Sequence, residues 1–232
     1  MRPLVWAALF AGCAAPPQAP VPVEPPSAQA LVCLWTSSTP TIDGEDTDTS
    51  WTLARPTTLL PSLGQSTGTA RCLRTDDGLA VFVSGPDTHL TATVTEHDGR
   101  TWDDDVFEVF IQPDTGEHYY EFHITPAGTT LDLRLPAPEG EDARTTNAPV
   151  FHQLSAVHLI GSLNDTTPDE GWSAEVWIPW SDIGGAPEPG ARWTGHVARY
   201  DYAADGTYAL ASTAPFTEVG FHRRHEWPDL LF

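Results

Sequence analysis

The stretch "DVFEVFIQPDTGEHYYEFHIT", residues 105–125, decides the fold predicted for this chain. Apolar and polar residues alternate on both sides of the turn signal "PDTGE", which predicts two strands joined as a hairpin. The apolar face holds Phe107, Val109, Ile111, Tyr120, Phe122 and Ile124. Because the apolar faces of paired strands must align, Glu108 should lie opposite Glu121 or His123 on the other face.

The other face of this hairpin combines carboxylates with aromatic groups. Its side chains are Phe110, Tyr119, Glu108, Glu121 and His123. Trp102 stands at the entrance of the first strand, in front of three consecutive acids. Aromatic groups beside hydrogen-bonding groups are typical of a site that grips a polar ring. We therefore expect an open sheet face that binds a ligand.

Short alternating segments, broken by Gly, Pro, Asn and Asp, occur on both sides of the hairpin. The predicted strands are residues 79–85, 105–112, 118–125, 129–135, 156–163, 172–180 and 192–203. The segment "PWSDIG", residues 179–184, adds a single helical turn. Many short strands separated by turn signals predict an all-β fold, an antiparallel β-sandwich of jelly-roll type, over residues 31–232.

Strand parity also separates core residues from surface residues outside the hairpin. Trp172, Ala174, Val176, Ile178 and Trp180 share one parity and are expected in the core. Arg199 falls on the core-side parity of its strand, which predicts a buried ion pair. The turn "DGEDTD", residues 43–48, is expected to deliver Trp51 into the core.

The charge balance restricts the partners of this 232-residue chain. It has 32 acidic residues, 11 arginines and no lysine, for a net charge of −21. Such a field repels phosphate groups, so nucleic acid and anionic membrane surfaces are excluded as partners. Neutral polar ligands and cations remain. The acidic excess also keeps an exported protein soluble.

The N-terminus reads as a targeting segment. Arg2 precedes a short apolar run that ends in "LFAGC", residues 9–13, and this resembles the lipobox of bacterial lipoproteins. We expect residues 1–12 to be a signal peptide and Cys13 to be lipidated, although export with ordinary cleavage stays open. Residues 13–30, with six prolines, read as an extended tether. The expected location is the outer membrane or the periplasmic side of the envelope, with the lipid as the only membrane contact.

Two further cysteines, Cys33 and Cys72, belong to the folded part. An exported protein can form a disulfide, and an even count favours one. A closed loop of about 40 residues would stabilise the fold by ~4 kcal/mol in the chain-entropy description. Two buried thiols are the alternative.

Five ordered blocks of the sequence resemble family 9 carbohydrate-binding modules and their DOMON-like relatives. The resemblance extends over residues 35–232. The blocks are "PTIDGEDTDTSW" (40–51), "RTWDDDVFEVFIQP" (100–113), "HYYEFHITPAGTTLDLRL" (118–135), "GWSAEVWIPWSDIG" (171–184) and "RWTGHVARYDY" (192–202). The resemblance implies a non-catalytic β-sandwich that binds the ends of glucan or xylan chains, often beside a glycoside hydrolase in polysaccharide catabolism.

The resemblance also assigns roles to residues of this chain. Trp102 matches the tryptophan that stacks on the sugar, and Glu108 matches a glutamate that hydrogen-bonds its hydroxyls. His123 stands where the family has an arginine, so a bidentate grip would be lost. Phe221 matches the second stacking aromatic, with His222 beside it. The fold therefore transfers to this chain, whereas the ligand specificity does not.

His123 carries a further hypothesis. If it hydrogen-bonds a ligand beside Glu108, the affinity should change between about pH 5 and 8.

The acids after Trp102 have two readings. Asp103, Asp104 and Asp105 could contribute oxygen ligands to a structural calcium ion, or they could cap the strand end in a solvated turn. Calcium is the structural ion that the sequence leaves open.

Three other functions remain alternatives. Glu108 and Glu121 could face each other at roughly 5 Å, as the acid and nucleophile of a retaining glycoside hydrolase do. A DOMON-type redox module would need haem ligands, and the only methionine is Met1, which leaves a bis-histidine site. An envelope protein that uses the sandwich for protein contacts alone is the third.

Overall fold

The computed structural model describes residues 30–114, 116–136, 151–188 and 191–232. The predicted signal peptide, the lipidation site Cys13 and the tether up to residue 29 lie outside the described residues. Within the described part of the chain, no helix is long and apolar enough to span a bilayer.

The predicted all-β fold is confirmed. The described strands are β1 Leu31–Trp35, β2 Thr57–Leu63, β3 Gly68–Arg74, β4 Gly78–Pro86, β5 Val106–Gln112, β6 His118–Ile124, β7 Thr130–Pro136, β8 Leu154–Ile160, β9 Gly171–Pro179, β10 Trp193–Tyr202, β11 Tyr208–Ser212 and β12 Asp229–Leu231. The helical segments among the described residues are 3₁₀ turns: η1 Thr49–Thr52, η2 Thr101–Asp103, η4 Trp180–Ile183 and η5 Arg224–Glu226.

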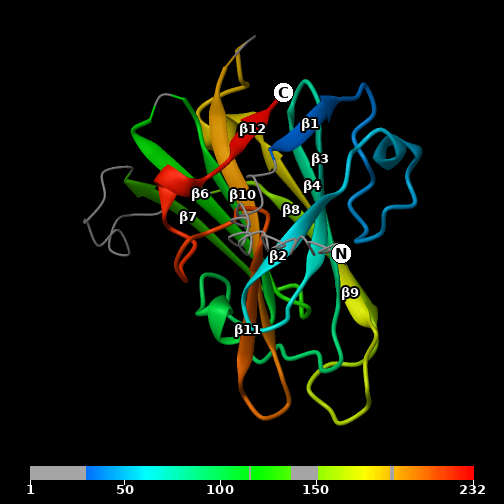
Figure 1. Cartoon of the computed structure of the whole chain (residues 1–232). Coiled ribbons are helices and arrows are strands. Elements are labelled where there is room, and N and C mark those ends of the chain that lie inside the picture. The colour runs from blue at the N-terminus through cyan, green and yellow to red at the C-terminus, as the bar shows by residue number, and fades with distance from the viewer. Residues whose placement is uncertain (1–29, 115, 137–150, 189–190) are drawn as a thin grey trace, which may run out of the picture.

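The strands form a two-layer β-sandwich (Figure 1). The first sheet has the order β7-β6-β5-β10-β11, and the second has the order β3-β4-β9-β8. Strand β2 pairs with both β11 and β3, so it joins one layer to the other. All ladders are antiparallel except those of β1, which runs parallel to β12 and to β3.

The β5–β6 hairpin has the register that alternation predicts. Glu108 lies opposite His123, and Phe110 lies opposite Glu121. Strand β10 pairs with the other edge of β5, where Ala198 is the partner of Glu108. Both carboxylates and the imidazole therefore project from the outer face of the first sheet.

The main core fills the space between the two sheets. It contains the apolar residues of the hairpin, and also Trp172, Ala174, Val176, Ile178 and Trp180, as predicted. Arg199 is fully buried, and its Nη2 lies 2.8 Å from Asp87 Oδ2, which confirms the predicted ion pair. Cys33 and Cys72 are joined by a disulfide that links β1 to β3 inside this core.

Each outer face carries a smaller apolar cluster under a long connection. Residues 213–228, between β11 and β12, bring Phe221 and Trp227 onto the first sheet. Residues 36–56, between β1 and β2, bring Trp51 onto the second sheet, where it contacts Phe82. The expectation for Trp51 needs correction, because its ring packs in this outer cluster and not between the sheets.

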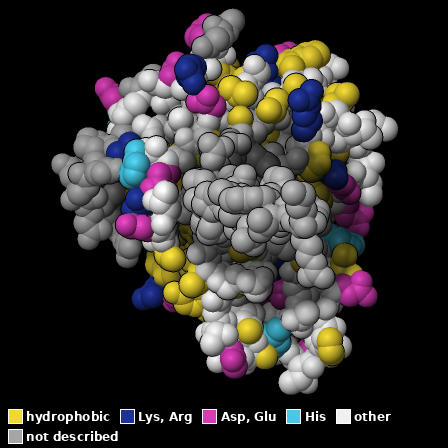
Figure 2. Space-filling model, in the orientation of Figure 1, with side chains coloured by type: hydrophobic (Ala, Val, Ile, Leu, Met, Phe, Trp, Pro, Cys, Tyr) yellow, Lys and Arg dark blue, Asp and Glu magenta, His cyan; other side chains and the backbone are white. Residues whose placement is uncertain are grey.

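The acidic side chains are dispersed on one face of the molecule. On the face that Figure 2 shows, Asp and Glu side chains lie at several separate places near the edge, with Arg side chains among them. The structure therefore presents no concentration of one charge on this view of the described residues.

Candidate functional site

A pocket of about 430 Å³ opens on the outer face of the first sheet. Its base is formed by the outward side chains of β5, β6, β7 and β10, and its walls by η2 and by the connection 213–228. The lining residues are Asp98, Trp102, Glu108, Glu121, His123, Leu131, Leu133, Leu135, Tyr200, Gly220, Phe221 and His222. The structure thus brings all six predicted carbohydrate-binding residues to one cavity.

A chain of alternating acids and histidines crosses the base of the pocket. His123 Nδ1 lies 3.5 Å from Glu108 Oε1, and His123 Nε2 lies 3.4 Å from Glu121 Oε2. On the far side of Glu121, Oε1 lies 3.1 Å from His222 Nδ1. Thr101 Oγ1 lies 2.9 Å from His123 Nδ1 and fixes the orientation of the ring.

These groups are much more buried than an open sheet face would allow. Glu108, Glu121 and His123 are each only 3% exposed, because the connection 213–228 and η2 close over them. The expected open face is therefore wrong; the site is a pocket. Glu121 Oε1 and His123 Nε2 have ion-pair contacts, at 3.1 Å to His222 Nδ1 and at 3.4 Å to Glu121 Oε2, but neither contact has hydrogen-bond geometry. Buried polar atoms normally make a hydrogen bond, so these two can still bind a ligand.

The two glutamates of this network have pKa values that are shifted in opposite directions. Burial raises the pKa of Glu108. Burial opposes the charge on Glu121 as well, but His123 and His222 outweigh it and hold its pKa at about 2. Burial would lower the pKa of His123, yet the neighbouring charges of Glu108 and Glu121 raise it above the usual value. The arrangement favours an imidazolium between two acids.

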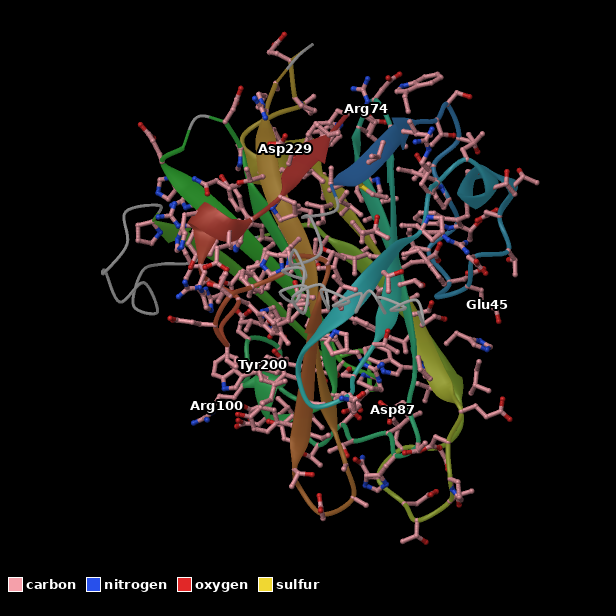
Figure 3. The ribbon with its side chains drawn as sticks, in the orientation of Figure 1. Glu45, Arg74, Asp87, Arg100, Tyr200 and Asp229 are labelled. Carbon is pink, nitrogen blue, oxygen red and sulfur yellow. A yellow bond between two sulfur atoms is a disulfide. The ribbon has the colours of Figure 1, made fainter. Side chains whose placement is uncertain are left out.

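Trp102 forms part of the pocket rim from η2. Its ring is half-buried, and the guanidinium of Arg100 lies 5.6 Å from the ring centroid. The hydroxyl of Tyr202 donates a hydrogen bond to the Trp102 carbonyl at 2.9 Å, which holds the turn in place. Figure 3 labels Arg100, whose guanidinium faces this ring, and Tyr200, which lines the pocket. The indole therefore combines an anchored backbone with partial exposure.

The acids after Trp102 hold the loops around the pocket. Asp103 lies 2.9 Å from the guanidinium of Arg100. Asp104 is fully buried and accepts hydrogen bonds from the backbone N–H groups of Thr93, at 2.7 Å, and Val94, at 2.6 Å. Both carboxylates thus have partners in the loop that surrounds them.

Asp105 turns toward another part of the chain. It accepts hydrogen bonds from the backbone N–H groups of Thr91 and Tyr202, both at 2.6 Å. Burial raises the pKa of Asp105 to about 8. Because Asp103, Asp104 and Asp105 contact separate partners and do not converge, their geometry fits the capping reading of this run.

Phe221 differs from an exposed stacking platform. It is 3% exposed, and its ring packs at 5.6 Å from the Tyr200 ring and at 5.9 Å from the Phe216 ring, centroid to centroid. Its carbonyl accepts a hydrogen bond from Trp227 Nε1 at 2.7 Å. Phe221 therefore shapes the wall of the pocket, with little ring area free for a ligand.

Sequence reasoning missed several residues that line the pocket. Tyr200 lines it from β10, where its outward parity next to the core-side Arg199 was an available signal. Leu131, Leu133 and Leu135 line it from β7, and their alternation in the predicted strand would have placed them on one face. Asp98 lines the pocket from a loop whose sequence gave no signal.

Comparisons with known proteins agree with this architecture. The sequence profile of a family described as carbohydrate family 9 binding domain-like matches residues 42–215. A family 9 carbohydrate-binding module from Caldicellulosiruptor kristjanssonii, solved with cellotriose, is similar with a TM-score of 0.54 and 14% sequence identity, over 80% of this chain and 84% of that chain. The structure of that module with glucose gives a TM-score of 0.52 at 13% identity, over 80% and 86% of the two chains.

A second solved protein has the same fold. A candidate carbohydrate-binding protein from Bacteroides uniformis is similar with a TM-score of 0.62 and 16% identity, over 88% of this chain and 99% of that chain. At these identities the likeness concerns the fold alone. No curated protein sequence matches this chain significantly.

Proposed function

Because this chain belongs to the carbohydrate family 9 binding domain-like family, we propose that it is a non-catalytic module that binds carbohydrate in the pocket beside Trp102. The observation that carries the proposal is the pair of buried polar atoms without hydrogen bonds, Glu121 Oε1 and His123 Nε2, at the base of a cavity of about 430 Å³. Pockets for small ligands begin at roughly 300 Å³.

The polar groups suit the hydroxyls of a sugar. The Glu108 and Glu121 carboxylates accept hydrogen bonds from ligand O–H groups, and the His123 imidazolium donates one to a ligand oxygen. Hydrogen bonds to charged groups contribute about 1.5–3 kcal/mol each, which is enough to orient a neutral ligand. A phosphorylated ligand would be repelled by the two acids.

The apolar groups suit the carbon face of the same ring. Trp102 offers a half-buried indole at the rim, while Leu131, Leu133 and Leu135 form an apolar wall. The connection 213–228 closes one side of the pocket through Gly220, Phe221 and His222. A pocket closed in this way favours the end of an oligosaccharide over the middle of a long chain. The C. kristjanssonii module was solved with cellotriose and with glucose, so gluco-oligosaccharides are the first ligands to test.

The wider setting that we propose is the cell envelope. Lipidation at Cys13 and a proline-rich tether up to residue 30 would display the sandwich from a membrane as a lipoprotein. A separate glycoside hydrolase of polysaccharide catabolism would then act on the captured chain. The "LFAGC" motif and the export logic of the N-terminus support this part.

Isothermal titration of the protein with soluble cello- and xylo-oligosaccharides tests the binding. Trp102→Ala should abolish saturable binding without changing the circular dichroism spectrum. Trp35→Ala is the matched control, because Trp35 is 49% exposed on β1 and does not line the pocket. Equal binding by wild type and Trp102→Ala would refute the assignment of the site.

One observation favours a second candidate, a glycoside hydrolase that uses Glu108 and Glu121. The pKa of Glu108 is raised and that of Glu121 is about 2, and a pair of carboxylates driven apart in this way is what acid and nucleophile roles require. Release of reducing ends from a panel of glycosides, lost in Glu108→Gln, would establish this reaction. Binding without release would leave the non-catalytic module.

A further inference from the structure

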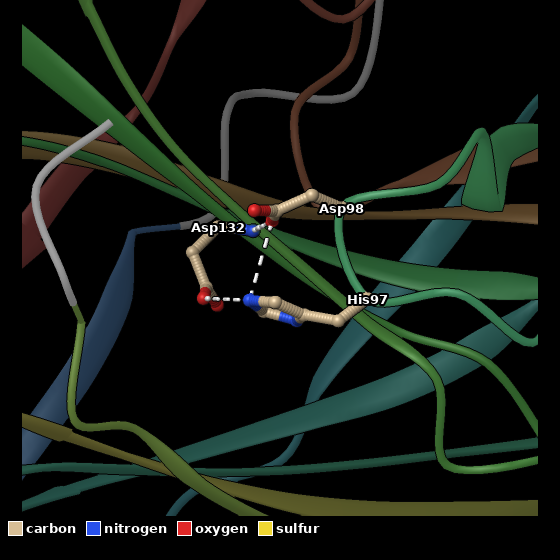
Figure 4. Close-up of side chains that lie close together, drawn as sticks. All are labelled: His97, Asp98 and Asp132. Carbon is tan, nitrogen blue, oxygen red and sulfur yellow. Dashed lines mark hydrogen bonds and ion pairs between the residues drawn. The ribbon is translucent and has the colours of Figure 1, made fainter. Parts of the chain in front are cut away.

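We propose that His97, Asp98 and Asp132 form a binding site for a divalent transition metal ion of zinc-like coordination chemistry. The three residues come from the loop before η2 and from β7 (Figure 4). One nitrogen and two carboxylate oxygens lie within 4.8 Å of one another. The site differs from the predicted carbohydrate-binding residues, although Asp98 also lines the edge of that pocket.

The distances match those between the ligands of one small ion. His97 Nε2 lies 3.5 Å from Asp98 Oδ1 and 3.5 Å from Asp132 Oδ2. Ligands at about 2.0 Å from a tetrahedral zinc ion are separated from one another by about 3.3 Å. Both distances from the histidine nitrogen are therefore within a few tenths of an ångström of this value.

The histidine has its coordinating nitrogen directed at the two acids. His97 Nδ1 lies 3.1 Å from the carbonyl oxygen of Thr130, and a carbonyl can only accept a hydrogen bond. Thr130 Oγ1 lies 3.0 Å from the same nitrogen. With the proton on Nδ1 and donated to the carbonyl, Nε2 carries the lone pair that a metal needs. Metal-bound histidines usually donate their other N–H to a carbonyl or a carboxylate in this way.

Asp132 is the buried member of the site. It is 5% exposed, and its Oδ1 accepts a hydrogen bond from Gln153 Nε2. Its Oδ2, which faces His97, accepts no hydrogen bond from the residues that the structure describes.

Asp98 is held in place by an unusual backbone conformation. Its φ angle is +61°, in the left-handed region that few residues other than glycine adopt. Its N–H donates to the Thr130 carbonyl at 3.0 Å, and its Oδ1 accepts from the Asp132 N–H at 3.2 Å. Strained residues of this kind concentrate at functional sites. Here the strain directs a second carboxylate at the histidine.

The ligand set indicates which cation fits. Calcium takes six to eight oxygen ligands, whereas an imidazole with two carboxylates suits zinc and its neighbours in the first transition row. The His97 side chain is 60% exposed and that of Asp98 is 47% exposed, so water can complete the coordination.

A second acidic cluster differs from this one because an arginine of the protein neutralises it. Asp87, Asp105 and Asp201 also bring three carboxylates within 4.8 Å. There, the guanidinium of Arg199 lies 2.8 Å from Asp87 and 3.5 Å from Asp201. A positive charge of the protein already balances that cluster. In the cluster at His97, the side chains of His97 and Asp98 are instead open to solvent.

Equilibrium dialysis against Zn²⁺ tests the proposal on the full chain. All samples should lack a polyhistidine tag and carry Cys13→Ser, so that neither adds a ligand. After treatment with a chelator, wild type should take up one equivalent of Zn²⁺ at micromolar concentration, and millimolar Ca²⁺ should not displace it. His97→Gln and Asp98→Asn should each weaken uptake by at least about tenfold, in line with the loss of one ligand.

The matched control is His158→Gln. His158 Nδ1 lies 2.7 Å from Glu45 Oε1, so it is an exposed histidine with a single acid. Its loss should leave the uptake unchanged. The visible absorption of bound Co²⁺ gives a second readout, which should appear in wild type and vanish in His97→Gln. Uptake that is unchanged in His97→Gln, or that Ca²⁺ displaces, would overturn the proposal. None of these results depends on carbohydrate binding.

Discussion

The outer faces of the two sheets each bury a glutamate under a long connection, but they treat it differently. On the second sheet, Glu175 accepts three hydrogen bonds: from the Asp43 N–H at 2.7 Å, the Gly44 N–H at 2.9 Å and Trp51 Nε1 at 2.7 Å. On the first sheet, Glu121 lies between two histidines, and its Oε1 has an ion-pair contact with His222 at 3.1 Å that lacks hydrogen-bond geometry.

This difference separates a structural carboxylate from one available to a ligand. Glu175 is fully buried and its three donors hold residues 36–56 on the sheet. Glu121 is nearly as buried, yet its environment supplies charge without fixed backbone donors. Both carboxylates are almost fully hidden from solvent, at 0% and 3% exposed, so the number of hydrogen bonds that each accepts is the better indicator of function.

The largest effect is expected for Glu175→Gln. The new amide would face three N–H donors with only one oxygen to accept their hydrogen bonds. We expect a loss of about 3–5 kcal/mol in the free energy of unfolding, the usual cost of breaking a buried charged network. Urea denaturation followed by fluorescence measures it. A loss below about 1 kcal/mol would contradict the structural role, since neutral hydrogen bonds are worth that much.

The isosteric change Glu121→Gln should affect binding as well as stability. Affinity for the oligosaccharide should fall about tenfold or more, because a charged acceptor is lost from the ligand site. The free energy of unfolding should also fall, because the pKa of about 2 means that His123 and His222 stabilise this carboxylate in the folded state. Titration calorimetry and urea denaturation on the same two variants give the comparison. Equal affinity in wild type and Glu121→Gln would show that this acid only supports the fold.

The pH dependence of binding should depend on His123. Its pKa is raised, so the imidazolium is present at and below the usual pKa of about 6.5 and is lost as the pH rises through the folded value. Glu121, with a pKa of about 2, stays charged throughout, and the other titratable groups near His123 are Glu108, His222 and Asp132. Affinity should therefore fall as the pH rises above about 6.5.

The free energy of unfolding should depend on pH in the same direction as the affinity. The stabilisation from a His123 imidazolium is complete below pH 6.5 and is lost at higher pH. Affinity measured from pH 5 to 9 in wild type and His123→Gln checks the assignment. A decline that persists in His123→Gln would show that another group titrates.

The smallest effect is expected for His222→Ala. The His222 side chain is 60% exposed, so its contact with Glu121 is screened by water. We expect a decrease in affinity of about threefold, in line with an exposed ion pair worth below 1 kcal/mol. A fall as large as that of Glu121→Gln would instead mean that His222 touches the ligand directly.

The alternation of apolar and polar residues predicts much of the sandwich and the register of the hairpin. A period of two placed Glu108, Glu121 and His123 on one face, because a shift by one residue would have exposed the whole apolar set. The strands that were missed are β1, β2, β3, β11 and β12. Pro61 interrupts the pattern of β2, and β12 has only three residues. The sandwich was therefore predictable where its strands were long and regular.

The closure of the pocket was not predictable in this way. Residues 213–228 have no period, so nothing in their order indicates that they fold over Glu108 and Glu121. The cluster of His97 and Asp98 with Asp132 was missed for a related reason. These residues are more than thirty positions apart, and the pairing of β7 with β6 and the left-handed turn at Asp98 bring them together.

The position of β1 has a mechanical consequence. This strand follows the N-terminal segment directly, and it is fixed to the body through its ladders with β3 and β12 and through the Cys33–Cys72 bond. A pull on that segment would first load a covalent link in the interior, so the sandwich would resist unravelling from this end. Under reducing conditions the same pull would meet only two short ladders.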